Sequence, residues 1–332
     1  MIRFLSNMKQ SEANKKVLRI LLENARLPIS KISKKTGLSR EIVTYSIKKL
    51  EKEGVIKSYV ARINQPFFCE GIASVFFKLI KTNKQRSKEI ISYLKNHNSV
   101  NWVAELCGNA DLVVTILYKN SEDLANTASE ITKFIGSNLK ENDVSLYITE
   151  YKFSRKGLIY EKEEQYKPIT FRGKVKEISL DEKDALMLSE LSKNCRIKNS
   201  ELATLINLSE DMVRIRIKKL EDKGIILGYT LVIDTNALGF ESYYVGLKIE
   251  NMIKEVSDKI RYYVSTNPYI TFAARTAGRY DVVFTISTKN RQHFRDILSD
   301  INNKLGENVL NYEFLLNIDE HKEIFVSEGF FK

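Results

Sequence analysis

The 332-residue chain carries 53 Lys and Arg against 42 Asp and Glu, a formal net charge of +11. It is longer than a usual single domain, and its hydrophobic and charged contents of 43% and 29% are typical of globular proteins, which excludes a disordered or fibrous chain. No apolar run approaches the roughly 18 residues that span a bilayer, the start lacks a cleavage signature and the three cysteines are scattered, so we expect a cytoplasmic protein without membrane contact or a metal site.

The first segment, residues 10–62, has the pattern of a helix-turn-helix. Two short helices are expected over Lys15–Asn24 and Ser30–Thr36, and Gly37 ends the second. Ser39 can cap a third helix, whose apolar side chains recur at i, i+4 and i+7, so one face packs inward. The opposite, basic face suits a major groove. We predict DNA contacts from Arg40, Thr44, Tyr45, Lys48, Lys49 and Lys52.

The charge of the chain is concentrated on this first segment. Residues 9–60 hold 13 basic and 5 acidic residues, a net charge of +8. Residues 179–233 hold 9 of each and are neutral. A basic excess that coincides with a helix-turn-helix is typical of phosphate binding, although lysine-rich helices are also found as simple solvated surfaces.

The next segment, residues 70–153, predicts a ferredoxin-like domain. Its order is strand, helix, two strands joined by a Gly-Asn-Ala-Asp turn, helix and strand, which is the βαββαβ arrangement. A strand or wing at Val55–Ile63 precedes it. The expected elements are Ala73–Leu79, Arg86–His97, Val100–Cys107, Leu112–Tyr118, Ser121–Leu139 and Val144–Tyr151.

The whole pattern then returns. A charged linker over residues 154–178, with a possible short strand, leads to a second helix-turn-helix at 179–233 and a second ferredoxin-like segment at 240–326. The spacing is a constant 170 residues except at the end, where a shorter last helix would match Val309–Leu316 to Val144–Tyr151 at 165. We predict an α+β fold made by tandem duplication. The second set of expected DNA contacts is Arg214, Arg216, Lys218 and Lys219.

Three motifs carry a resemblance to a known family. The pattern IKKLE-x-x-G-[VI]-I occurs at Ile47–Ile56 and Ile217–Ile226, a G-x-x-D turn joins the middle strands of both ferredoxin-like segments, and Asp234–Phe240 looks like an interdomain hinge. In these features the chain resembles the Lrp/AsnC (feast/famine) transcriptional regulators, which are archaeal and bacterial. The resemblance implies binding of double-stranded DNA and of a small effector, such as an amino acid, near the turn.

The resemblance places the effector site by position. Four of the six residues it implies are the glycines and aspartates of the two turns, and a tight turn that needs glycine and is closed by aspartate would account for them without any ligand. The effector-binding residues that the resemblance implies are Glu105, Gly108, Asp111, Arg275, Gly278 and Asp281.

The duplication leaves three questions open. Family members pair identical subunits, so we expect an intrachain pseudo-dimer with its two sheets packed on each other, although equivalent halves could pair between chains and form homo-oligomers. Sirohaem decarboxylases also resemble this family and use His and Arg, but no histidine occupies matching positions of the two halves, so we predict no catalytic residue, no cofactor and no enzyme activity. A third possibility is a ligand- or partner-binding module whose helix-turn-helix domains do not touch DNA.

Overall fold

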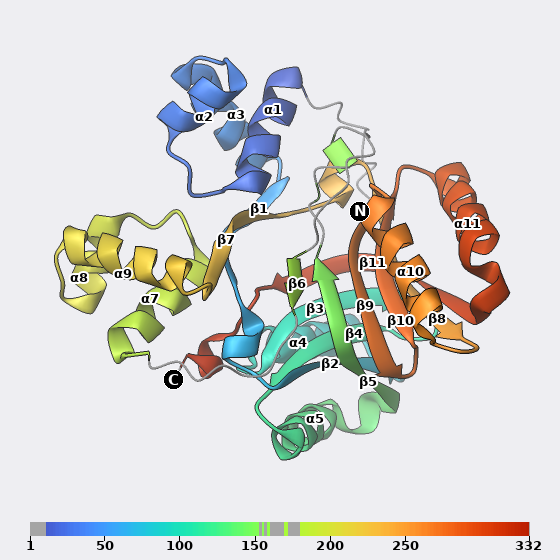
Figure 1. The fold of residues 1–332 in the computed structure, drawn as a ribbon. Helices are drawn as coiled ribbons and strands as arrows, with labels where there is room; N and C mark the ends of the chain where they lie inside the picture. The colour runs from blue at the N-terminus through green and yellow to red at the C-terminus, as the bar shows by residue number, and fades with distance from the viewer. Residues whose placement is uncertain (1–10, 153–154, 156–157, 160–168, 172–179, 332) are drawn as a thin grey trace. The chain divides into compact units, whose positions relative to one another are not determined.

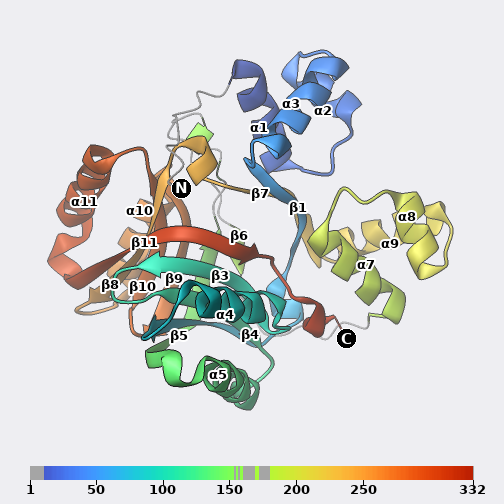
Figure 2. The same ribbon diagram turned by 180° about the vertical axis from the view of Figure 1, so that it is seen from behind.

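The computed structural model describes residues 11–152, 155, 158–159, 169–171 and 180–331 (Figures 1 and 2). The chain forms two compact units. The first unit contains both helix-turn-helix segments and the chain from Ile324 onward, and the second contains both ferredoxin-like segments. Most of the expected linker at 154–178 and of the chain start at 1–14 lies outside the described residues.

The first unit contains two three-helix heads, which we call the first head (11–63) and the second head (180–233). The Ser39 hydroxyl accepts a hydrogen bond from the Ile42 amide at 3.3 Å, which confirms it as a helix cap. Gly37 and Asn207 end the second helix of each head in the left-handed conformation. The helices are α1 Glu12–Glu23, α2 Ile29–Thr36, α3 Arg40–Lys52, α7 Glu182–Lys193, α8 Asn199–Ile206 and α9 Glu210–Asp222.

Each head ends in a strand that pairs with the strand of the other head. β1 (Ile56–Ile63) and β7 (Ile226–Ile233) form a two-stranded antiparallel sheet. The connection extends to the helices, because the Ala25 amide donates to the Tyr229 carbonyl at 3.2 Å and the Cys195 amide donates to the Tyr59 carbonyl at 2.8 Å. These two bonds are equivalent at the 170-residue spacing, so the heads are joined reciprocally.

The second unit holds two βαββαβ halves. The first half has β2 Gly71–Leu79, α4 Lys84–Asn96, β3 Val100–Cys107, β4 Leu112–Tyr118, α5 Ser121–Ile135 and β5 Leu139–Lys152. The second half has β8 Glu241–Ile249, α10 Lys254–Thr266, β9 Ile270–Gly278, β10 Val282–Thr288, α11 Arg291–Leu305 and β11 Val309–Glu323. A short strand, β6 (Ile169–Phe171), pairs with β5 inside the expected linker.

The strands of the two halves belong to one sheet. Their order is β2-β4-β3-β11-β8-β10-β9-β5-β6, and β5 also pairs with β2. Eight strands therefore close into a ring, which leaves none of the eight with a free edge along its whole length. The two junctions between halves, β3 with β11 and β5 with β9, are antiparallel and are called seams below.

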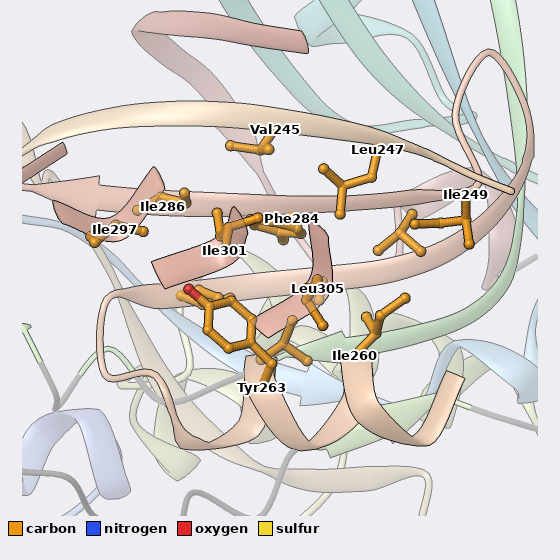
Figure 3. Close-up of a cluster of buried hydrophobic side chains, with 14 of the residues drawn as sticks. Val245, Leu247, Ile249, Ile260, Tyr263, Phe284, Ile286, Ile297, Ile301 and Leu305 are labelled. Carbon is orange, nitrogen blue, oxygen red and sulfur yellow. The ribbon is translucent and has the colours of Figure 1, made fainter. Parts of the chain in front are cut away.

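Hydrophobic side chains fill both faces of this ring. The outer face of each half is covered by its two helices, and Figure 3 shows the cluster in the second half, where side chains of α10 and α11 meet those of β8 and β10. A third cluster lies inside the ring and combines side chains of both halves, among them Phe76, Leu106, Tyr244, Tyr280 and Leu315.

The expected shortening of the last helix is wrong. α5 and α11 both have 15 residues, and both are followed by a short 3-10 turn. Leu146 pairs with Ala73 in the first half, and Leu316 pairs with Tyr243 in the second. The spacing therefore stays at 170 to the end of the repeat, and Val309 corresponds to Leu139 rather than to Val144.

Candidate nucleic-acid interface and effector region

The exposed face of α3 carries the first head's expected DNA contacts. Arg40, Lys48 and Lys52 are exposed, and within the described residues no carboxylate lies within ion-pair distance of any of them. Tyr45 projects beside them with 66% of its surface accessible. The Thr44 hydroxyl is less available, because it donates to the Arg40 carbonyl at 2.8 Å. This face offers free cations and one aromatic ring to a partner.

The first turn of α3 holds a capping hydroxyl and a carboxylate. The Ser39 hydroxyl caps the helix, and hydrogen bonds from the Glu41 backbone and from Ser39 hold the pKa of the Glu41 carboxyl below its ordinary value. Lys49 differs from the other lysines, since its Nζ lies 3.8 Å from a carboxylate oxygen of Glu53. Lys49 is therefore directed toward the end of its own helix.

The basic residues of α9 have acidic neighbours instead. The Arg214 guanidinium lies 3.2 Å from Asp211, and Lys218 Nζ lies 3.8 Å from Asp222. Lys219 is exposed, and no ion pair involves it among the described residues. The second head thus presents its cations together with anions on the same helix.

Arg216 does not belong to the exposed face of α9. Its side chain is mostly covered and lies 2.7 Å from carboxylate oxygens of both Asp181 and Asp184 at the start of α7. These hydrogen bonds raise the pKa of the Arg216 guanidinium above its ordinary value, with Asp184 contributing most. The first head has Ser46, Ser11 and Asn14 at the same three positions. Arg216 therefore fastens α9 to α7 rather than facing a groove.

The two heads differ most in the charge of their helix-turn-helix faces. From α2 to α3, residues 29–52 hold seven basic and two acidic residues, a net charge of +5. From α8 to α9, residues 199–222 hold four basic and five acidic residues, a net charge of −1. Only the first face has the charge that a phosphate backbone requires.

Two arginines that sequence reasoning missed join the heads. Arg26 donates through Nη2 to Asn199 Oδ1 at 2.6 Å, bonds the Cys195 carbonyl and lies over the Tyr229 ring. Arg196, its equivalent at the 170-residue spacing, donates to the Ala25 carbonyl and lies over the Tyr59 ring. Their equal spacing was a signal, although nothing in the sequence shows that the partners belong to the other head.

The G-x-x-D turns have a structural role in both halves. Asp111 accepts from the Leu79 amide at 2.7 Å and from Lys78 Nζ at 3.0 Å, and Asp281 makes the equivalent bonds with Ile249 and Lys248. Both carboxylates thus tie the turn to the first strand of their own half. Both aspartates therefore have protein partners that account for them without a bound ligand.

The glycines of these turns allow the two halves to approach. Gly108 and Gly278 have φ of 143° and 139°. A Cβ on Gly278 would lie 2.2 Å from the Val144 carbonyl oxygen on β5, and one on Gly108 would lie 2.7 Å from Cδ2 of Leu315 on β11. Each glycine therefore packs against the last strand of the other half.

Glu105 and Arg275 are equivalent positions on the two seams, where Glu105 is half-buried and Arg275 is exposed. Glu105 lies opposite Asp319, and His321 Nε2 is 3.4 Å from Glu105 while its Nδ1 is 3.6 Å from Asp319. Arg275 lies opposite Thr149 and borders a small hollow that Arg261 and Tyr151 also line. At this position the two seams therefore carry side chains of opposite charge. The structure brings each predicted residue close to its own turn but does not gather all six into one site.

Another cluster absent from the sequence predictions surrounds Arg279. Its guanidinium lies 2.7 Å from Asp143 on β5 and 3.1 Å from Glu313 on β11, and its Nε donates to the Tyr280 hydroxyl at 2.8 Å. The Tyr280 hydroxyl also bonds Glu313. Asp143 and Glu313 are equivalent residues of the two halves, so one arginine bridges both.

Comparisons with known proteins agree with this architecture. A family model described as winged helix-turn-helix DNA-binding matches residues 10–57 and again 180–226. The HTH-type transcriptional regulator FL11 of Pyrococcus horikoshii is 36% identical over 115 residues, covering 35% of this chain and 75% of the relative. LrpA of Pyrococcus abyssi is 32% identical over 131 residues, covering 39% and 87%.

One solved structure matches almost the whole chain. The crystal structure of the siroheme decarboxylase NirDL has a TM-score of 0.61 and 14% identity, and the match covers 96% of each chain. At that identity the likeness shows the shared fold alone. Within the part of the chain that the structure describes, no helix combines the length and apolar character needed to cross a membrane.

These findings define a regulator with two helix-turn-helix heads and two ferredoxin-like halves. The chain belongs to the Lrp/AsnC family of transcriptional regulators, as a tandem duplication of the family's usual architecture.

Proposed function

We propose that the chain binds DNA sequence-specifically, chiefly through the first head. The observation that carries the proposal is the exposed set of Arg40, Lys48 and Lys52 around Tyr45, which form no ion pair among the described residues and lie on a face of net charge +5. Arg40, Thr44, Tyr45 and Lys48 would read base edges, and Lys49 and Lys52 would contact phosphates. Arg214, Lys218 and Lys219 contribute less, because their face is not net positive. We leave Arg216 out because it binds α7.

The test is a salt titration of binding to the DNA upstream of the chain's own gene. We compare the wild type with Arg40→Ala/Lys48→Ala and with the matched second-head variant Arg214→Ala/Lys218→Ala. The slope of log K against log salt is negative, and each lost phosphate contact should reduce its magnitude by about one. Each lost base contact should cost about 1–3 kcal/mol of binding free energy. The first variant should lose specific binding while the second keeps most of it. Equal losses would show that both heads read DNA, and specific binding unchanged in the first variant would refute the assignment.

We also propose that the two halves of one chain form a pseudo-dimer. Both seams join strands of different halves, and Arg279 contacts equivalent acids on the two. Pairing of equivalent halves between chains would leave two first halves with two copies of Asp143 and no Arg279. If pairing is intrachain, the fluorescence of Trp102 inside the ring should not change with dilution. A dilution-dependent change would favour pairing between chains.

The proposed effector site lies on the seams at Glu105 and Arg275. Its support is their equivalent positions and their accessibility, partial for Glu105 and full for Arg275, whereas the four turn residues already have structural partners. Because Arg275 and Glu105 have opposite charge, an amino acid would meet a cation at one seam and an anion at the other. Calorimetric titration of the twenty amino acids into the wild type, Glu105→Gln and Arg275→Gln would test this. Binding that neither substitution changes would exclude these residues.

An enzyme of the siroheme decarboxylase kind is the alternative that the NirDL fold suggests. The three histidines lie at unrelated positions, since residues 267, 123 and 151 are Asn, Asp and Tyr where the other half has His97, His293 and His321. That distribution favours a regulator without catalysis. A spectral titration with an iron-porphyrin would test it, because a stoichiometric absorbance shift would favour the enzyme.

A further inference from the structure

The second head carries exposed apolar side chains on the face that reads DNA in the first head. Leu205, Met212 and Ile215 expose 53%, 42% and 59% of their surface on α8 and α9. Isolated exposed apolar residues are common, but a group on a face meant for a polar polymer is not. At the same positions the first head has Lys35, Ile42 and Tyr45.

The change is systematic along the second head. Three lysines of the first head, Lys16, Lys35 and Lys57, are replaced by the exposed leucines Leu186, Leu205 and Leu227. Two further cations of α3 are replaced by acids, since Glu210 and Asp222 stand where the first head has Arg40 and Lys52. This combination removes attraction for phosphate and adds apolar surface, which favours a protein partner over DNA.

The charges on α9 complement each other about its apolar centre. Asp211 lies four residues before Ile215 and Lys218 lies three residues after it, on the same side of the helix. When two copies of α9 pack antiparallel about Ile215, Asp211 of one copy therefore lies beside Lys218 of the other, twice by symmetry. Such an isologous contact closes on itself and needs no other partner.

The charges are free to make this exchange. Asp211 and Lys218 expose 81% and 76% of their side chains, and their present ion pairs with Arg214 and Asp222 lie within one helix. Exposed pairs of this kind contribute little, so exchanging them for pairs between copies costs little. A self-complementary charge pattern around exposed apolar residues is what a contact between identical helices requires.

We propose that α9 of the second head is a dimerisation surface that binds α9 of a second copy of this chain. The apolar residues Leu205, Met212 and Ile215 form its centre, and Asp211 pairs with Lys218 of the other copy. The two first heads then belong to one assembly and remain free for DNA. The contact does not depend on the proposed DNA binding, so each can fail without the other.

The test measures the mass of the nuclease-treated full-length protein by sedimentation over a range of concentrations. The wild type should dimerise, and Ile215→Glu should weaken dimerisation at least tenfold. Tyr45→Glu, the matched change on the first head, should leave dimerisation unchanged. Because both Ile215 and Tyr45 are largely exposed, both variants should fold, which circular dichroism would check.

A charge-reversal series makes the test specific for the antiparallel geometry. Asp211→Lys and Lys218→Asp should each weaken the dimer, because each creates two like-charge pairs, and the double variant should restore it. A wild type that stays monomeric would overturn the proposal. So would a dimer that Ile215→Glu leaves intact, or a double variant as weak as the single ones.

Discussion

Alanine substitution of two glycines with the same backbone conformation would isolate the effect of the seam contact. Gly108 and Gly278 have φ of 143° and 139°, so an L side chain is strained equally at both, by about 1–3 kcal/mol. They differ in what the new methyl group meets. On Gly278 it meets the backbone carbonyl of Val144 at 2.2 Å, and on Gly108 it meets the end of the Leu315 side chain at 2.7 Å.

The magnitudes follow from how far these neighbours can move. A leucine side chain can rotate away, so Gly108→Ala should cost mainly the strain, about 1–3 kcal/mol. The backbone of β5 is held by hydrogen bonds on both sides, so Gly278→Ala should cost a further 1–3 kcal/mol, roughly, for overpacking. Gly306 has helical φ and ψ, and a Cβ added there would meet no atom within 4 Å, so Gly306→Ala should be neutral or stabilising by up to about 1 kcal/mol.

The single tryptophan makes the assay direct. Trp102 packs against the cluster inside the ring, so its fluorescence during urea unfolding reports on the second unit. The expected order of destabilisation is Gly278→Ala, then Gly108→Ala, then Gly306→Ala. Equal losses for Gly108→Ala and Gly278→Ala would show that turn conformation alone matters and that the close approach of β5 has no energetic role.

Three further predictions concern ionisable groups. Arg216→Met should destabilise the second head by about 1–3 kcal/mol by leaving buried Asp184 without its cation, which hydrogen exchange on α7 and α9 would measure. The pKa of Asp181 is lowered in the folded state, mainly by a backbone hydrogen bond. Its contribution to the stability of the second head is therefore present above the unfolded pKa near 4 and is lost as pH falls through the folded pKa. Hydrogen-exchange protection of α7 that does not fall in this pH range would contradict this. Among the cysteines, burial raises the pKa of Cys69 and Cys195 to about 12 while Cys107 is exposed, so a thiol reagent at pH 8 should modify one equivalent in the folded protein and three in urea. Three equivalents in the folded protein would show that the structure around both Cys69 and Cys195 opens.

Local sequence signals predicted the elements of each half well. Ser39, Gly37 and Asn207 lie where their conformational preferences place them, and the turns that begin at Gly108 and Gly278 lie where expected. These features depend on a few adjacent residues, so a single sequence contains the information. The same holds for the basic face of α3, because helical periodicity alone assigns its side chains to one side.

The last strand is the place where the match between the two repeats was misread. Matching Val309 to Val144 shifts β11 by five residues, and an odd shift exchanges the two faces of a strand. The apolar pattern favours the true register, since 144, 146 and 148 and their true equivalents 314, 316 and 318 are all apolar, whereas the shifted match sets Asn311 against Leu146 and Glu313 against Ile148. The pairing of β11 with β8 confirms the register given by the 170-residue spacing.

The contacts between halves, in contrast, were inaccessible from the sequence. Alternation along β3 or β5 indicates which face is buried, but it does not identify β11 or β9 as the neighbour. The same limit hid Arg26 and Arg196, whose partners lie about 170 residues away. The charge of the second head, in contrast, was accessible from the sequence, because its acids and leucines can be compared with the first head position by position once the 170-residue spacing is known.

The interior of the ring supports the proposed pairing of the two halves within one chain. Phe76 and Ala110 in the first half correspond to Gly246 and Tyr280 in the second, so each half has one aromatic ring and one small residue in exchanged places. Tyr280 fills the space above Gly246, where a Cβ would lie 2.4 Å from its ring, and packs edge-on against Phe76. Two second halves would supply two such tyrosines without Phe76, and two first halves would supply two copies of Phe76 without Tyr280 or its arginine neighbour. The substitutions compensate each other only when unlike halves meet, and a tether of one chain makes that the encounter of highest effective concentration.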